Sequence, residues 1–204
     1  MQSRARLVAV FILATLTAGT AQEFAPSPEA SAGFLRKVDG IRARGAEEAT
    51  SAPAPFARRT VIDEGELNAW LALELAPQLA PSGITDTRVS MLPDNRVTSR
   101  STVDLEALRG PVEPDVFDPL TLLRGRVPVA ITGSVASDAG EARFTVEEAS
   151  VGGVPLPPAL LQQLVTRYSR TPDRPEGVRL DEAFPLPAGI DRIVVGAGRA
   201  VVVQ

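Results

Sequence analysis

The sequence contains neither cysteine nor histidine. The absence of cysteine excludes disulfides, thiolate metal sites and a lipidated cysteine behind a leader segment. The absence of histidine excludes Ser-His-Asp and Cys-His catalysis and histidine-ligated metals. Carboxylates remain, but their spacing singles out no glycosidase pair, calcium loop or phosphate-binding loop. We therefore expect a protein that is not an enzyme and that uses no cofactor or metal.

Aromatic residues and clusters of positive charge are also scarce. Aromatic residues make up 4% of the chain, and the formal net charge is −4. Because lysines and arginines do not cluster along the sequence, it shows no basic footprint for nucleic acid and no polybasic segment for anionic lipid headgroups. We expect no nucleic-acid partner, and any transient membrane contact should use apolar surface.

The N-terminus has the pattern of a secretory signal peptide over residues 1–21. Arg4 and Arg6 form a basic start, LVAVFILATL is apolar, and small residues precede a cleavage site after Ala21. The apolar segment is short for a hydrocarbon core about 30 Å thick, which favours cleavage over an uncleaved anchor. Removal of both arginines would change the formal charge from −4 to −6. The sequence thus predicts a periplasmic or secreted protein.

Residues 22–57 read as a flexible arm rich in proline and alanine. Gln22–Ala32 is predicted to be unstructured, because it contains mainly proline, serine and alanine. A short helix is possible over Gly33–Glu48, where Phe34, Val38 and Ile41 have helical spacing, although two internal glycines weaken it. A single domain is expected to follow, over residues 58–204.

The most strongly apolar helical pattern of this domain is Val61–Leu79. Asp63 is the predicted N-cap, and Glu66 three residues later completes a capping box. Leucines recur every four residues, and Trp70 widens the apolar surface beyond one stripe. A single flat neighbour would not cover such a surface, so the pattern predicts that other elements wrap around this helix.

Alternating patterns downstream predict antiparallel strands. Thr85–Leu105 reads as a hairpin with its turn at Pro93-Asp94-Asn95, and Val127–Ser137 as the next strand. In the strand after that, Phe144 and Val146 have one parity while Ala149 and Val151 have the other. This change predicts a β-bulge near Glu147-Glu148.

The C-terminal part completes the predicted fold. A second amphipathic helix is expected from Pro158 to about Ser169, and a closing hairpin around Gly196-Ala197-Gly198. The predicted class is α+β: a long helix packed in a highly curved antiparallel sheet, with a second C-terminal helix and a closing hairpin.

Four segments resemble the small secreted bacterial lipid-binding proteins related to the tubular lipid-binding superfamily. They are IDEGELNAWL, STVDLEAL, EEASVGGVPLPPALLQQLV and FPLPAGIDRIVVGAGRAVVV, and they extend from about Val61 to the C-terminus. The resemblance implies a long helix held in a curled sheet and, by analogy, a phospholipid or similar hydrophobic ligand. It implies no catalytic residues.

Two functions follow as hypotheses. In the first, an acyl chain or phospholipid lies between the main helix, the inward strand residues and the second helix, and is held by apolar burial. In the second, the same fold has a dry core and binds an envelope protein as a scaffold or assembly factor. For Trp70, simple core packing competes with a position in the ligand cavity. The candidate ligand-binding residues are Leu67, Trp70, Leu71, Leu75, Val89, Met91, Val97, Val103, Val129, Ile131, Phe144, Val146, Leu160 and Leu164.

Overall fold

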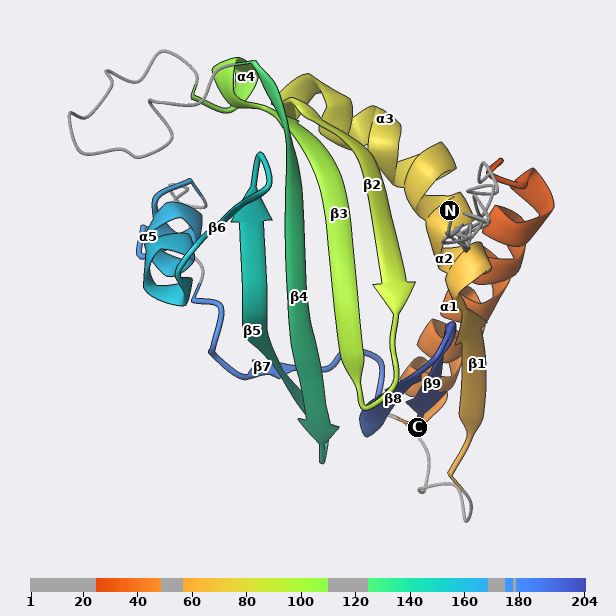
Figure 1. Cartoon of the computed structure of the whole chain (residues 1–204). Coiled ribbons are helices and arrows are strands. Elements are labelled where there is room, and N and C mark those ends of the chain that lie inside the picture. The colour runs from red at the N-terminus through yellow and green to blue at the C-terminus, as the bar shows by residue number, and fades with distance from the viewer. Residues whose placement is uncertain (1–24, 49–56, 110–124, 169–174, 178) are drawn as a thin grey trace, which may run out of the picture.

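The computed structural model describes residues 25–48, 57–109, 125–168, 175–177 and 179–204. It is an α+β protein with antiparallel strands, as predicted, and its strands form two sheets (Figure 1). The predicted signal peptide, most of the linker before residue 58 and the segment 110–124 lie outside the described residues.

The larger sheet has six strands, all paired antiparallel. Its order is β2-β3-β4-β5-β6, and β7 pairs with the other end of β5. The strands are β2 (Ile84–Met91), β3 (Arg96–Asp104), β4 (Arg126–Asp138), β5 (Glu141–Val151), β6 (Val154–Pro155) and β7 (Phe184–Pro185).

The turns of this sheet follow directly from local residue types. The predicted first hairpin is confirmed, and its turn residues Asp94 and Asn95 have φ values of 60° and 58°. Such left-handed pairs match the twist of the flanking strands, and Asp and Asn tolerate them better than most residues. The β4–β5 turn uses Ala139 and Gly140 in the same way, at φ 49° and 81°.

The smaller sheet joins the beginning of the domain to the end of the chain. The predicted closing hairpin is confirmed as β8 (Arg192–Gly196) and β9 (Arg199–Val203). The third strand, β1 (Arg59–Asp63), was not predicted, and it pairs antiparallel with β9 in the order β1-β9-β8. Its pattern is too short to identify a strand without the distant partner.

The helices lie mainly beside the two sheets. The predicted main helix consists of α2, η1 and α3, which follow one another without a break and end in the turn η2. Helices α1 and α5 are separate from it. The elements are α1 (Pro28–Glu48), α2 (Glu64–Trp70), the π-helical η1 (Leu71–Leu75), α3 (Ala76–Leu79), the 3₁₀ turn η2 (Ala80–Ser82), α4 (Leu105–Arg109) and α5 (Pro158–Tyr168).

The helix predicted in the N-terminal arm is confirmed, but α1 begins earlier than expected. Residues 28–32 are helical, so the prediction of an unstructured leader is wrong for them. The start is marked by Ser27, whose Oγ accepts from the Ala30 N–H at 3.3 Å, and by Pro28 in the first turn. Serine followed by proline is a typical helix start, because proline presets φ and needs no N–H there.

Helix α1 is also docked on the domain. Lys37 Nζ donates to Glu66 Oε2 at 2.6 Å, and the Gln204 side-chain amide donates to the Ile41 carbonyl at 2.8 Å. At Gly45 a side chain would collide with the backbone of Ala188, so this glycine permits a close approach. One of the two glycines that weakened the helix prediction thus serves the packing of the helix.

The main helix begins as predicted. Asp63 is the N-cap, and in the capping box its N–H donates to Glu66 Oε2 at 3.1 Å. The helix widens at η1, where the Ala76 N–H bonds to the carbonyl of Leu71, five residues back. Pro77 supplies no N–H and crowds the carbonyls of the preceding turn, which accounts for this local π turn.

The sheet does not curl around this helix, and that expectation is corrected. The helix α2–η1–α3 runs along the outer edge of β2, with α1 on its other side (Figure 1). Its apolar residues on several sides are explained by two neighbours: Trp70 packs on Phe34 of α1, and Leu67 packs with Met91 and the small sheet. The edge of the larger sheet and one helix cover what a curled sheet was expected to cover.

Candidate ligand-binding site

The strands of the larger sheet place their aliphatic residues on one face. In the register, Val89 lies next to Ser99, which lies next to Ile131, which lies next to Ala149. Directly paired residues, and residues two apart along a strand, share a face. All eight predicted strand residues therefore belong to one face, which we call the apolar face. They are Val89, Met91, Val97, Val103, Val129, Ile131, Phe144 and Val146.

The predicted bulge keeps this face continuous on β5. Gly133 pairs with Val146, whereas the preceding Thr132 pairs with Glu148, so Glu147 is the extra residue. The bulge is confirmed, and it brings Ala149 onto the same face as Val146 despite their odd spacing. The opposite, polar face carries the charges of these strands. There, Arg96 Nε donates to Glu147 Oε2 at 2.8 Å.

A glycine that the sequence analysis did not single out lets Phe144 lie across the apolar face. A Cβ added at Gly133 would be 2.6 Å from the Phe144 ring and 2.5 Å from the Thr145 carbonyl oxygen. The ring therefore occupies the space above β4 that any larger residue would fill. This is the arrangement in which an aromatic side chain covers a neighbouring glycine in a sheet.

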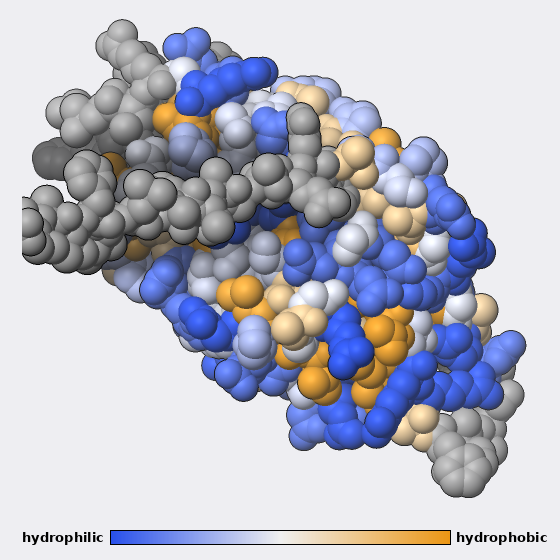
Figure 2. All heavy atoms as spheres, turned by 45° about the vertical axis from the view of Figure 1, so that its right-hand side comes forward, coloured by the Kyte–Doolittle hydropathy of each residue, from blue (hydrophilic) through white to orange (hydrophobic). Residues whose placement is uncertain are grey.

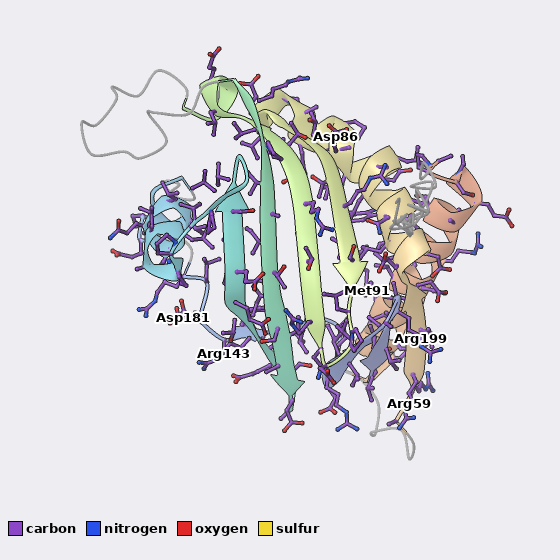
Figure 3. The ribbon with its side chains drawn as sticks, in the orientation of Figure 1. Arg59, Asp86, Met91, Arg143, Asp181 and Arg199 are labelled. Atoms are coloured by element: carbon purple, nitrogen blue, oxygen red, sulfur yellow. The ribbon has the colours of Figure 1, made fainter. Side chains whose placement is uncertain are left out.

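The two ends of the apolar face are covered by different groups. At one end, Leu105 and Val127 are buried, with Leu164 of α5 packed against them. At the other end, Met91 packs with Val195 of the small sheet and with Leu67 of α2. Met91 is labelled near this end of β2 in Figure 3.

Between these ends, the cover of the apolar face is uneven, because Ala149, which pairs with Ile131, is 8% exposed while other residues are half-buried. Val89 and Ile131 are half-buried and belong to neither cluster of buried residues. Next to them, Ser99 and Ser101 are half-buried, and neither hydroxyl bonds to another residue in the described parts of the chain. The middle of the face thus combines half-buried aliphatic surface with two available hydroxyls.

The helical residues of the predicted site do not all join this face. Leu71 is buried, and Leu67 and Leu75 are half-buried. Trp70 instead packs against Phe34, with ring centroids 5.1 Å apart and planes tilted by 33°. Trp70 therefore belongs to the contact between α1 and α2. Its surroundings agree with simple packing and not with a position in a ligand cavity.

The second predicted helix contributes in part. Leu164 packs at the covered end of the apolar face, Leu160 is half-buried, and the buried leucine of α5 is Leu161. Between α5, β5 and residues 176 and 179–181 lies a cavity of about 530 Å³. Val146, Pro158 and Leu180 supply apolar lining, and Gln162 and Arg179 are among its polar residues. Figure 3 marks this side of the molecule by Asp181, which also lines the cavity.

Asn68 holds the main helix to the sheet, and the sequence analysis missed it. Its side chain accepts from the Val89 N–H at 2.8 Å and donates to the Val89 carbonyl at 2.7 Å. Glu64 Oε2 accepts from the next outward N–H, that of Met91, at 2.7 Å. These side chains replace a further strand along the edge of β2. A polar residue within an apolar helical pattern was the only available signal.

Among the residues that the structure describes, the pKa that departs clearly from its ordinary value is that of Glu66, at the start of the main helix. Partial burial alone would raise the pKa of Glu66. The hydrogen bonds from Lys37 and the Asp63 N–H, with the charges of Lys37 and Arg36, outweigh this effect and hold the pKa below its ordinary value. The group is a structural anion that ties α1 to α2. No three acidic side chains of the described residues converge as metal ligands.

The comparisons with known proteins add no family to this description. A scan against protein-family models gave no match, and a search of curated proteins gave no significant match. The resemblance to the tubular lipid-binding superfamily therefore stays a prediction from the sequence. In the described parts of the chain, no helix has the length and hydropathy needed to cross a bilayer.

Proposed function

We propose that this protein binds one hydrophobic ligand, a phospholipid or another acyl-chain molecule, and that it acts in the periplasm or outside the cell. The acyl chain would lie along the middle of the apolar face and reach the cavity beside Val146. This position differs from the one predicted around Trp70, because it uses the sheet face and α5 in place of the helix surface against α1.

The incomplete cover of the apolar face is the observation that supports this proposal. The paired residues of β2 to β5 place no charged side chain on it, and of its eight predicted residues only Met91 is buried. Partly covered aliphatic area is costly in water, by about 25 cal/mol per Å², and a ligand that covers it recovers this free energy less its ordering costs.

The ligand class follows from the chemistry of the same face. Its side chains are aliphatic apart from Phe144 and small hydroxyls, which suits a flexible hydrocarbon better than a stacked ring system. Ser99 and Ser101 offer hydroxyl donors in its middle, where an ester or carboxyl oxygen of an amphiphile would find a partner. A ligand pocket typically combines apolar walls with a few such polar groups.

Native mass spectrometry of gently purified protein, together with uptake of a fluorescent fatty acid, tests this proposal. Ile131→Gln puts an amide on the apolar face and should reduce uptake strongly. Its matched control is Ala130→Gln, because Ala130 is the adjacent half-buried residue and faces the polar side. Thermal unfolding would confirm that both variants fold. A lipid-free spectrum without fatty-acid uptake by the unchanged protein would refute the proposal.

A scaffold or assembly factor that acts through protein contacts is the second candidate. The packing of Trp70 on Phe34 favours it, since protein closes the helix surface that was expected to line a ligand cavity. In this case, Ile131→Gln should lower stability without changing any lipid signal. Co-purification of a stoichiometric envelope protein with the lipid-free chain would then support the scaffold.

A further inference from the structure

Two of the outer strands have side chains that replace a missing neighbour. On β2, Asn68 satisfies the N–H and carbonyl of Val89, and Glu64 satisfies the N–H of Met91, as described above. On β8, Asn95 accepts from the Val195 N–H at 2.8 Å and donates its own N–H to the Val195 carbonyl at 3.1 Å. The hydroxyl of Ser137 likewise accepts from the Ile193 N–H and donates to the Ile193 carbonyl, both at 2.8 Å. Such cover prevents an outer strand from pairing with another chain.

The hydrogen-bond pattern of β1 shows which of its backbone groups face outward. Arg58 and Gln204 exchange both backbone hydrogen bonds, at 2.8 and 2.9 Å. At the other end, the Glu64 N–H donates to the Gly198 carbonyl at 2.8 Å. Bonded and non-bonded pairs alternate in an antiparallel ladder. The backbone N–H and carbonyl groups of the even-numbered residues of β1 therefore bond to β9. Those of the odd-numbered residues point away from β9.

This outward edge of β1 is open. The Asp63 N–H is taken by Glu66, but the outward N–H and carbonyl of Arg59 and Val61 have no partner in the described part of the chain. Val61 is 42% exposed, and α1 packs on the other face of the small sheet, where Ile41 contacts Val202. Arg59, labelled in Figure 3, marks the end of this edge.

The side chains along the β1 edge of one copy of the chain complement those of a second copy. If two β1 strands pair antiparallel with Val61 opposite Val61, Arg59 of each copy lies opposite Asp63 of the other. Opposite charges directly across an antiparallel pair are favourable. Asp63 also caps the main helix and pairs with Lys37 at 3.6 Å, but its side chain is 58% exposed, which leaves carboxylate surface for a second cation.

The pairing would also join two hydrophobic rows. Val61, Val201 and Val194 lie in register across the small sheet on its outer face, and Val194 is 45% exposed. Figure 2, which turns this side of the molecule forward, shows hydrophobic side chains among hydrophilic ones. A two-fold axis perpendicular to the sheet would place both rows on the same face, end to end.

We propose that β1 is a self-association edge, at which two copies of this chain pair through Arg59–Asp63 to form one continuous six-stranded sheet. The central contact consists of two backbone hydrogen bonds exchanged between the Val61 residues, flanked by two Arg59–Asp63 pairs. The proposal is independent of ligand binding on the apolar face of the larger sheet.

Analytical ultracentrifugation of the purified chain over a concentration series tests this inference. The unchanged protein should show a monomer–dimer equilibrium, and the Val61 amide should exchange hydrogen more slowly at high concentration. Val61→Pro removes only an outward N–H, which proline tolerates on an outer strand. We expect its dissociation constant to rise about ten-fold or more, because two hydrogen bonds per dimer are lost.

A charge variant keeps the test valid if Val61→Pro does not fold. Arg59→Glu places like charges opposite each other and should raise the dissociation constant by about three-fold or more. Arg192→Glu is the matched control, since Arg192 lies on the same outer face but on β8, away from the edge. It should leave the equilibrium unchanged.

Several results would overturn the inference. One is a monomer at every concentration, and another is a dimer that persists in both Val61→Pro and Arg59→Glu. A third is binding of the monomer to phosphatidylglycerol vesicles that Arg59→Glu and Arg192→Glu weaken equally. That result would identify an anionic membrane as the occupant of this surface.

Discussion

The two sheets follow the same alternation of apolar and polar residues, and each apolar face carries both buried and half-buried residues, but the half-buried residues lie in different places. On the small sheet, Val195, Ala200 and Val202 are 6%, 7% and 5% exposed. They pack against α1 and the end of the larger sheet. On the larger sheet, Val89 and Ile131 are only half-buried between two separate clusters. Alternation decides which residues face inward, and the neighbouring elements decide whether anything covers them.

This difference separates structural interior from candidate binding surface. A packed cluster loses both apolar burial and cavity energy when a side chain is shortened. A half-covered face loses less, because water or a ligand already borders the side chain. Variants that shorten equal side chains in the two regions should therefore differ in their effects on stability and on ligand uptake.

The largest expected effect concerns a matched pair of isoleucines. Ile190 is 8% exposed and packs with Ile41 and Val202, so Ile190→Ala should destabilise by about 2–5 kcal/mol. Ile131→Ala removes the same atoms from the half-covered face and should cost about 1–2 kcal/mol while weakening fatty-acid uptake. Urea unfolding measures both. Equal destabilisation without a change in uptake would show that Ile131 is packed as tightly as Ile190 and borders no ligand site.

The second prediction tests how the main helix is held beside the sheet. Asn68→Ala leaves the Val89 N–H and carbonyl without partners at a site where Asn68 is 7% exposed, which should cost about 2–3 kcal/mol. The control is Gln78→Ala, because this exposed amide on the same helix also donates to a backbone carbonyl, that of Glu74. Its effect should stay below about 0.5 kcal/mol. Similar losses in the two variants would contradict the role of Asn68.

The smallest effect concerns the ion pair between α1 and α2. The folded pKa of Glu66 is below its unfolded value of about 4.3, so its contribution is complete above that pH. It is lost as the pH falls through the folded pKa. Glu66→Gln should cost about 1 kcal/mol or less near neutral pH and flatten the acid limb of the stability curve.

Chemical denaturation at a series of pH values would measure this effect. Glu74→Gln serves as the control, since Glu74 is an exposed residue of the same helix. An acid limb that is unchanged by Glu66→Gln would show that α1 is held without this carboxylate.

Local features of the fold were predictable because neighbouring residues determine them. Asp94 and Asn95 adopt the left-handed conformation that a tight hairpin turn requires. The change of parity around Glu147 identified the bulge, since a strand that keeps one apolar face needs an extra residue there. The start of α1 was predicted wrongly, because the low complexity of the segment obscured the helix start at Ser27 and Pro28.

Contacts between distant segments were not predictable in the same way. The pairing of β1 with β9 joins residues at opposite ends of the domain, and nothing in five residues of β1 identifies that partner. Arg59, Arg192 and Arg199 are scattered along the sequence, yet the register places them on one face of the small sheet. The lack of a basic cluster along the sequence therefore did not predict that three arginines share this face.

The sequence by itself determined strands β2 to β5, the closing hairpin, their turns, the bulge, the capped main helix and the identity of the residues on the apolar face. These features depend on backbone conformation and residue period, which operate over a few positions. Tertiary structure alone decided that the main helix lies along an edge and that Phe34 covers Trp70. It also left the outward backbone groups of Arg59 and Val61 without a partner among the described residues. Such outcomes depend on which distant surfaces meet, because apolar burial is not directional and specifies no partner.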